Sequence, residues 1–239
     1  MATLQILRAT LATCSTATGL VVAIDVLRAF TTAGYLFEAG VSEIVLVSGV
    51  QEALRLKTKL PGSLTLGEID GIKVDAFDLG NSPSQLPSYG LAGRRIIQRT
   101  TAGTQGVVLA SRAETILAAA LTNASATARR IQELAPPQVT LIQTGLFAGQ
   151  DWGDEDVACA DLIEALLLGR SMDLEEIARR VRASRSGLHY DGTRPDFPPP
   201  DLDLALQFDR FDFAMQVEWS NSLHVLHAVG LPRARAGNS

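Results

Sequence analysis

The sequence has few cysteines, few aromatic residues and no long apolar run, and each shortage excludes a class of protein. Two cysteines among 239 residues, Cys14 and Cys159, give neither a disulfide framework nor the paired spacing of a zinc site. No apolar stretch approaches the ~20 residues that cross a bilayer. Residues 1–19 also lack the continuous apolar core of a secretory signal. We therefore expect a cytoplasmic protein with no membrane partner.

Basic residues are in the minority. Lys plus Arg number 21 and Asp plus Glu number 26, which gives a formal charge of −5. Nucleic-acid-binding domains normally have a basic balance or a basic stripe, so we expect no nucleic-acid partner. In contrast, 46% of the residues are hydrophobic, which is enough for a folded core and excludes an intrinsically disordered chain.

Short apolar runs alternate with helical patterns along the chain. Strands are predicted at 19–25, 43–47, 64–67, 94–98 and 138–142, and helices at 29–39, 50–60, 124–134 and 157–168. Such alternation is typical of layered α/β proteins. We predict an α/β fold with three layers, α/β/α, around a mixed, mainly parallel sheet.

The character of the chain changes near residue 170. Four prolines between 195 and 200 predict a loop there. We predict a core at 1–170 that carries the site motifs, and a C-terminal α+β appendage at 171–239, packed on the core or continuous with it. Phe208, Phe211, Phe213 and Trp219 suit either a core or an interface, so a homo-oligomer stays open.

The first candidate site follows a predicted strand. Asp25 ends an apolar run and Arg28 comes three residues later, near a helix start. In open α/β sheets, ligands bind outside the carboxyl ends of the strands. The Asp is suited to hold a metal and the Arg to bind a phosphate or sulfonate, although an ion pair that braces the loop explains both residues equally well.

A second candidate site contains Glu68 and, further along, the string Asp78-Leu79-Gly80-Asn81-Ser82-Pro83. Ser82 and Pro83 have the pattern of a helix start, with Ser82 as the N-cap. Capping does not explain Glu68 and Asp78, which lie near glycines in apolar surroundings. Carboxylates on loops are ligands that Mg²⁺ prefers.

The third candidate site is the turn from Arg99 through Thr100, Thr101 and Gly103 to Thr104, which follows a predicted strand. Unpaired backbone N–H groups at a helix start, threonine hydroxyls and an arginine suit an anion. Simple threonine capping is the alternative. The P-loop motif is absent.

Three consecutive acids, Asp154, Glu155 and Asp156, open a helix. The helix dipole favours acids in a first turn. Three in a row also indicate a metal ligand or a general acid or base. Cys159 lies one turn into the same apolar helix, where packing is a better explanation than nucleophilic chemistry.

These blocks resemble a known family. The strings AIDVLRA at 23–29, GE at 67–68, FDLGNSP at 77–83, RTTAGT at 99–104 and EDVACA at 155–160 occur in the order found in 2-phosphosulfolactate phosphatases. Many relatives have Asn where Ala102 stands and Gly where Asp161 stands. The resemblance implies an α/β/α fold and a Mg²⁺-dependent hydrolysis of (2R)-phospho-3-sulfolactate to 3-sulfolactate and phosphate, a step of coenzyme M biosynthesis. The implied partner is thus a small anionic phosphorylated substrate.

With this resemblance, the candidate residues receive roles. Asp25, Arg28 and Glu155 are the predicted catalytic residues, with Glu155 as the general base toward water and a covalent phosphate on Asp25 as the alternative. The predicted metal ligands, for Mg²⁺, are Asp25, Glu68, Asp78 and Asp156. Substrate binding is predicted for Asn81, Ser82, Arg99, Thr100, Thr101, Gly103 and Thr104.

Two other functions stay open at this stage. The same turns would serve a phosphatase for another 2-phospho acid. They would also serve a non-catalytic protein that binds an anionic metabolite, in which case the carboxylates would only brace loops.

Overall fold

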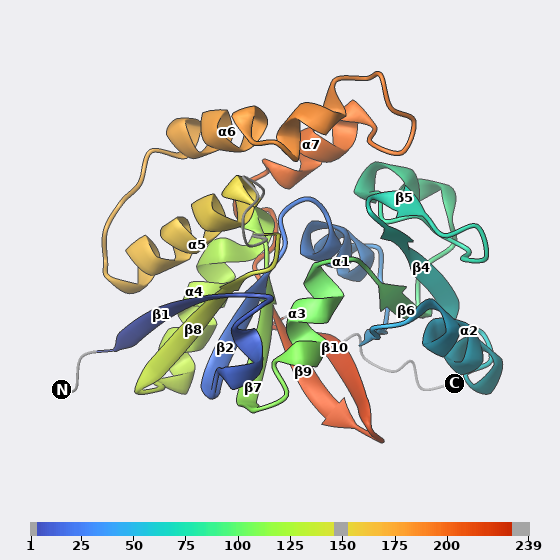
Figure 1. Cartoon of the computed structure of the whole chain (residues 1–239), viewed down its shortest axis with the longest axis horizontal. Helices are drawn as coiled ribbons and strands as arrows, with labels where there is room; N and C mark the ends of the chain where they lie inside the picture. Colours follow the sequence, from blue (N-terminus) through green and yellow to red (C-terminus); the bar gives the residue numbers. More distant parts are fainter. Residues whose placement is uncertain (1–3, 146–152, 231–239) are drawn as a thin grey trace, which may run out of the picture.

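The computed structural model describes residues 4–145 and 153–230 (Figure 1). Its strands are β1 (Gln5–Thr10), β2 (Gly19–Ile24), β3 (Glu43–Leu46), β4 (Leu64–Ile69), β5 (Ile72–Lys73), β6 (Arg95–Arg99), β7 (Ala113–Ala119), β8 (Gln138–Gln143), β9 (Ala214–Ser220) and β10 (Leu223–Val229). Its α-helices are α1 (Ala29–Glu38), α2 (Val50–Lys59), α3 (Gly103–Leu109), α4 (Ala124–Leu134), α5 (Asp154–Leu167), α6 (Leu174–Ala183) and α7 (Pro199–Ala205). Short 3-10 helices lie at η1 (Cys14–Thr16), η2 (Pro83–Ser88), η3 (Leu121–Asn123) and η4 (Gly187–Tyr190).

The strands form one mixed sheet in the order β1-β8-β2-β7-β9-β10-β3-β6-β4-β5. Five of the nine strand pairings in the described part of the chain are parallel. Helices lie on both faces (Figure 1). The predicted three-layer α/β/α fold with a mainly parallel sheet is therefore confirmed.

The layers follow from the two-residue period of the strands, because successive side chains point to opposite faces. In β2, Val21 and Ala23 belong to the core that contains α1 and α3. Leu20, Val22 and Ile24 belong to the core that contains α4 and α5. A third, smaller core lies between α2 and the strands β3 and β6. Both faces of β2 are buried, which explains why its sequence reads as one continuous apolar run.

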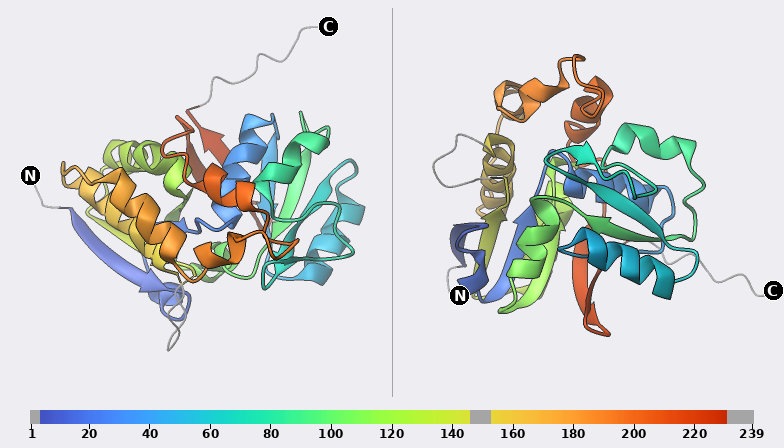
Figure 2. Two further views of the ribbon diagram at one scale, coloured as in Figure 1. Left: turned by 90° about the horizontal axis from the view of Figure 1, so that it is seen from above. Right: turned by 45° about the vertical axis from the view of Figure 1, so that its right-hand side comes forward.

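The end of the C-terminal segment is part of the sheet. The hairpin β9–β10 lies inside the sheet, where β9 pairs with β7 and β10 pairs with β3 (Figure 2). Phe211 and Phe213, just before β9, are buried in the main core, whereas Trp219 is 67% exposed. The last part of the chain thus joins the two parallel halves of the sheet, rather than packing against a completed core.

Three strands, β1, β7 and β10, were not predicted from the sequence. β7 carries three alanines, which on their own favour a helix, and its position between β2 and β9 decides the outcome. β1 pairs with β8, which is far away in the sequence, and β10 pairs with the distant β3 as well as with its hairpin neighbour β9. Their conformation is fixed by neighbours that a local pattern does not contain.

The hairpin has a consequence for the site. Three successive antiparallel pairings separate β7 from β3, so in a flat sheet the carboxyl ends of the two halves would face opposite edges. Six pairings separate β2 from β4. A twist of roughly 20–25° at each of these steps rotates the second half well past a right angle. The carboxyl ends of β2, β4, β6 and β8 can then approach one another.

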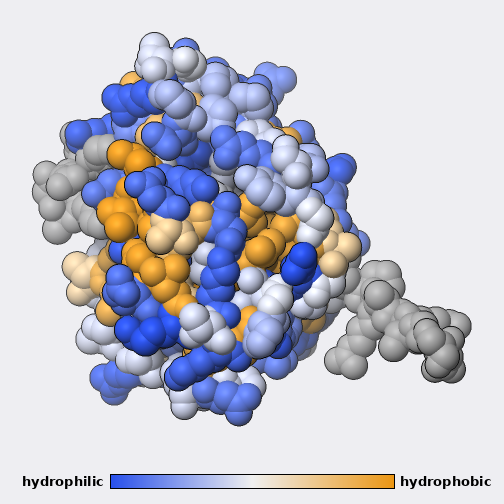
Figure 3. All heavy atoms as spheres, turned by 90° about the vertical axis from the view of Figure 1, so that its right-hand side faces the viewer, coloured by the Kyte–Doolittle hydropathy of each residue, from blue (hydrophilic) through white to orange (hydrophobic). Residues whose placement is uncertain are grey.

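The segment with α6 and α7 lies across one end of the molecule, above the carboxyl end of β2 (Figure 1). On the face that carries α2, β4 and β5, apolar surface occurs in separate patches among hydrophilic residues (Figure 3). Ile69 and Ile72, which pair at the sheet edge, are 46% and 56% exposed. No helix within the described ranges has the length and apolar character to cross a membrane.

Candidate active site

A pocket of about 360 Å³ lies where the carboxyl ends of four strands meet. Asp25 and Arg28 come from the loop after β2, Glu68 from β4, Thr101 from the loop after β6 and Gly145 from the loop after β8. The start of α5 adds Glu155 and Asp156, and residues 186–197 close the other side. Four of the acidic residues singled out in the sequence therefore share one cavity.

Asp25 is held by backbone donors. Its Oδ1 accepts from the N–H of Ala29 at 2.9 Å, at the start of α1. Gly103 approaches so closely that a Cβ there would lie 2.7 Å from Oδ2 of Asp25, which explains the glycine. Burial raises the pKa of Asp25 to about 7; the N–H groups of Ala29 and Gly103 oppose this shift, and the charges of Glu68 and Glu155 add to it.

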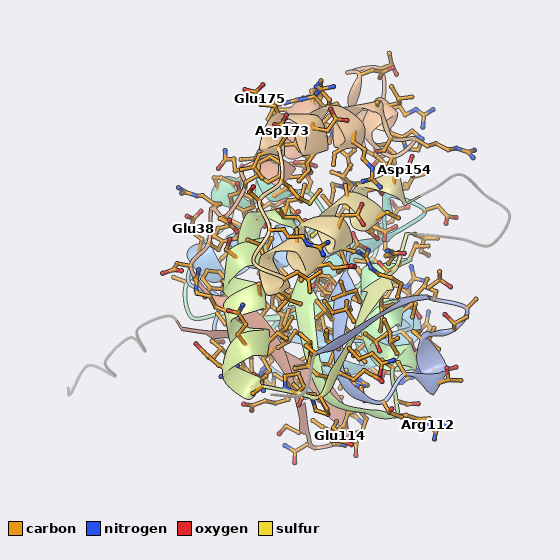
Figure 4. All side chains as sticks on the ribbon, turned by 90° about the vertical axis from the view of Figure 1, so that its left-hand side faces the viewer. Glu38, Arg112, Glu114, Asp154, Asp173 and Glu175 are labelled. Carbon is orange, nitrogen blue, oxygen red and sulfur yellow. The ribbon has the colours of Figure 1, made fainter. Side chains whose placement is uncertain are left out.

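The three consecutive acids at the start of α5 have different surroundings. Asp154 is exposed at the end of the helix (Figure 4). Glu155 and Asp156 are only 3% and 2% exposed. Asp156 accepts from the N–H of Val26 at 2.8 Å and from the N–H of Gly145 at 2.7 Å, and so ties the loops after β2 and β8 together.

Glu155 has an unsatisfied oxygen. Burial raises the pKa of this residue, while hydrogen bonds from Ser186 and Ser184 lower it. Its Oε2 is buried and has no hydrogen-bond partner within residues 4–145 and 153–230. A buried unpartnered carboxylate oxygen is costly, and it indicates that a water, a cation or a substrate group belongs there.

Glu68 is occupied by the protein itself. Its Oε1 accepts from the N–H of Thr101 at 2.6 Å, and its Oε2 accepts from the N–H of Gly71 at 2.6 Å and from the hydroxyl of Thr101 at 3.0 Å. The carboxylate thus links the β4–β5 turn to the loop after β6. It is well placed to fix the shape of the pocket.

The pocket has the donor chemistry of a site for a hard cation. Asp25, Glu68, Glu155 and Asp156 all contribute carboxylates, and Oδ1 of Asn81 is another buried oxygen that has no partner in the described part of the chain. Mutual repulsion contributes to the raised pKa values of Asp25 and Asp156. Within residues 4–145 and 153–230, no three acidic, His or Cys side chains form a ready ligand set. A cation such as Mg²⁺, which usually keeps several waters, fits this chemistry better than a metal that needs a closed protein cage.

Arg28 lines the pocket but is 4% exposed and already paired. Its Nη1 donates to Asp201 at 2.8 Å and to the carbonyl of Asp196 at 2.9 Å, and its Nη2 donates to the carbonyl of Gly71 at 3.0 Å. The sequence left open an ion pair between Arg28 and Asp25 that braces the loop. In the structure Arg28 does form a bracing ion pair, but its partner is Asp201.

The contacts of Asp78 favour a structural carboxylate over the predicted metal ligand. Both of its carboxylate oxygens accept from Nζ of Lys57, at 2.6 and 2.7 Å, and Oδ2 also accepts from the N–H and hydroxyl of Thr65. It does not line the cavity. The partner, Lys57, lies in α2 and belongs to none of the local motifs, so the sequence pattern did not indicate this ion pair.

Several predicted substrate-binding residues also point elsewhere. Arg99 donates from Nη1 to the carbonyl of Glu68 and from Nε to that of Ser48. Thr100 and Thr104 bond to each other and are buried. Ser82 occupies the N-cap position of η2, yet its hydroxyl donates to Asp201 at 3.0 Å. None of these four side chains lines the pocket, whereas Thr101 and Asn81 do.

The segment at 186–197, which also borders the pocket, was not among the predicted site residues. Ser186, His189, Tyr190 and Phe197 line the pocket. The ring of Phe197 packs on Gly71, where a Cβ would lie 2.3 Å from the ring. The aromatic residues around the proline-rich stretch were the available signal, but nothing local indicates which part of the fold they cover.

The chain is similar to known proteins along most of its length. A family model described as 2-phosphosulpholactate phosphatase matches residues 6–189. A probable 2-phosphosulfolactate phosphatase of Carboxydothermus hydrogenoformans is 42% identical over 212 residues, which cover 87% of this chain and 84% of the relative. The protein of the same description from Bacillus subtilis is 30% identical over 210 residues, covering 87% and 91%. That of Deinococcus radiodurans is 37% identical over 168 residues, covering 69% and 68%.

Proposed function

Because the chain belongs to the 2-phosphosulpholactate phosphatase family, and is therefore a phosphatase, we propose that it hydrolyses (2R)-phospho-3-sulfolactate with Mg²⁺. The products are 3-sulfolactate and phosphate. The observation that carries the proposal is the gathering of Asp25, Glu155 and Asp156 with Arg28 in one pocket at the carboxyl ends of the strands. The cytoplasmic location and the role in coenzyme M biosynthesis stay predictions.

Within this proposal, Asp25 would hold Mg²⁺ together with water ligands, and Glu155 stays free to act as the general base. The bound ion neutralises part of the charge on the phosphoryl group. Asp156 and Glu68 keep the surrounding loops in place through their bonds to backbone N–H groups. Asn81 and Thr101, which also line the pocket, provide polar contacts to the substrate.

The chemical step transfers the phosphoryl group to water. A bond forms between the water oxygen and phosphorus while the ester bond to the C2 oxygen of the substrate breaks. The proton of the water passes to Glu155, whose Oε2 has no hydrogen-bond partner among the residues that the structure describes, and the leaving oxygen takes up a proton from solvent. A covalent phosphate on Asp25 is the alternative, and retention of labelled phosphate on the protein after quenching would reveal it.

The decisive experiment measures phosphate release from a panel of phosphomonoesters with Mg²⁺ and with a chelator. We expect (2R)-phospho-3-sulfolactate to rank first and the chelator to abolish turnover. Asp25→Asn and Glu155→Gln should each lower kcat by about 10²–10⁴-fold. Asp154→Asn, at the exposed neighbouring acid, is the matched control and should stay within twofold of the wild type.

Each alternative gives a different result. A preference for another 2-phospho acid would identify a different substrate for the same chemistry. Tight binding of the substrate without turnover, unaffected by Asp25→Asn, would indicate a non-catalytic metabolite-binding protein and would refute the proposal.

A further inference from the structure

A buried carboxylate from α7 reaches the site from outside the sequence motifs. Asp201 is fully buried, and it lies beyond residues 6–189, which the family model matches. Its Oδ2 accepts from Nη1 of Arg28 at 2.8 Å. Its Oδ1 accepts from the hydroxyl of Ser82 at 3.0 Å and from the N–H of Ser84 at 2.9 Å. One side chain thus links α7 to the loop after β2 and to the start of η2.

The guanidinium of Arg28 is fixed from several directions. Besides Asp201, the carbonyls of Asp196 and Gly71 accept its N–H groups. The rings of Tyr190 and Phe197 lie 5.7 and 5.2 Å from its Cζ atom, within cation–π distance. The orientation of the guanidinium is therefore set mainly by residues of the C-terminal segment.

This arrangement leaves one edge of Arg28 unused. A guanidinium has five N–H groups. Both on Nη1 and one on Nη2 donate to the protein. Within the described part of the chain, the N–H of Nε and the second N–H of Nη2 have no acceptor. Nε and Nη2 are the two nitrogens of one edge of the guanidinium, and such an edge binds paired oxygens of carboxylate, sulfonate or phosphate.

The ion pair with Asp201 affects how Arg28 is held next to the acids of the pocket. Arg28 shares the pocket with Asp25 and Glu155, which are both buried. Without a counter-ion, the guanidinium would be drawn toward these carboxylates and would occupy the space of the substrate. Asp201 balances the charge of Arg28 through their ion pair and does not itself line the pocket.

We propose that Asp201 is a positioning residue that holds Arg28 with its Nε–Nη2 edge open to an anionic group of the substrate. The proposal rests on the proposed function, since it assumes that a phosphorylated anion enters this pocket. The group received is a phosphoryl, a sulfonate or a carboxylate, all of which present paired oxygens.

The test compares Asp201→Asn with Asp203→Asn, a matched control on the same helix. Asp203 is exposed and pairs with Arg182 at 2.9 Å. For Asp201→Asn we expect kcat/KM to fall about 10²-fold. An increase of KM of about tenfold or more should account for at least part of this loss. We also expect the inhibition constant of inorganic phosphate or of 3-sulfolactate to rise at least tenfold. The product affected identifies the group that Arg28 binds. If neither constant rises, the proposal is wrong.

A second arm asks whether Asp201 acts through Arg28. Arg28→Lys keeps the charge and loses the fork, so it should lower kcat/KM about as much as Asp201→Asn does. The double variant should then be no worse than either single variant, whereas multiplied losses would contradict the proposal. If Asp201→Asn does not fold, Arg28→Ala in millimolar guanidinium replaces it. Saturable recovery of activity is expected, and no recovery counts against the proposal.

The outcome is separable from that of the proposed function. If the wild type hydrolyses none of the phosphomonoesters, the proposed function fails. Calorimetric binding of inorganic phosphate and of 3-sulfolactate to the wild type and to Asp201→Asn then still tests the role of Asp201. At least tenfold weaker binding of one of them in the variant is expected, and equal binding of both refutes it.

Discussion

Substituting Asp78 by Asn distinguishes a structural carboxylate from a metal ligand. The sequence predicts that Asp78 holds Mg²⁺, but in the structure it accepts four hydrogen bonds, two from Lys57 and two from Thr65. The side chain of Asp78 is 28% exposed and that of Lys57 is 35% exposed. We therefore expect Asp78→Asn to reduce the stability of the protein and to leave its Mg²⁺ dependence unchanged.

The size of the effect follows from these contacts. A hydrogen bond to a charged group contributes about 1.5–3 kcal/mol, and an exposed ion pair about 0.2–1 kcal/mol because water screens it. An asparagine keeps one acceptor oxygen for Thr65 and loses the ion pair with Lys57. The free energy of unfolding should therefore decrease by about 1–2 kcal/mol. For a chain of this size, that corresponds to about 2–8 °C in Tm.

The pH dependence of this difference has a defined sign. Burial raises the pKa of Asp78, but the hydrogen bonds from Lys57 and Thr65 outweigh it and bring the pKa below its usual value of 3.8. An acid whose pKa is lower in the folded state stabilises the protein fully above its unfolded pKa. This contribution is lost as the pH falls through the folded pKa. The difference between wild type and Asp78→Asn should be constant near pH 7 and shrink below about pH 4.

The assay pairs thermal denaturation at several pH values with phosphate release at increasing Mg²⁺ concentration. Asp75→Asn, at an exposed acid of the same loop, is the control and should change neither quantity. An unchanged Tm, together with a tenfold or greater increase in the Mg²⁺ concentration for half-maximal activity, would refute the reasoning. It would also restore Asp78 as a ligand.

Two further predictions concern the packing around the site. Gly103→Ala would place a Cβ 2.6 Å from that of Ala29 and 2.7 Å from Oδ2 of Asp25, so it should cost about 1–3 kcal/mol of stability and most of the activity. Gly90→Ala, with nothing within 4 Å, should change neither in the same melting and turnover assays. Cys14 and Cys159 are buried free thiols whose pKa values are raised by burial. Iodoacetamide should therefore label both cysteines in urea and neither in the folded enzyme. Rapid labelling of Cys159 in the native protein, with loss of activity, would mean that this thiol is reactive.

The site illustrates how far local sequence patterns reach. Asp25 was placed correctly at a strand end, because a buried strand followed by a carboxylate and a helix start is a local signal. Glu155 and Asp156 were identified as a group with Asp154, but the pattern could not show that only Asp154 faces solvent. The Arg99–Thr104 turn was expected to bind the anion through backbone N–H groups, threonine hydroxyls and the arginine. In the structure Thr101 reaches the pocket, while Arg99, Thr100 and Thr104 bind the protein itself.

The sequence by itself determined the layered α/β class, most helices, the central strands and the acids that follow them. These features depend on apolar periodicity and on turn residues, which act over a few positions. Only the tertiary structure decided that the hairpin β9–β10 joins the two halves of the sheet, that Lys57 removes Asp78 from the site, and that Asp201 holds Arg28. Each of these depends on contacts between segments far apart in the chain, and a local pattern carries no information on which distant group will supply the partner.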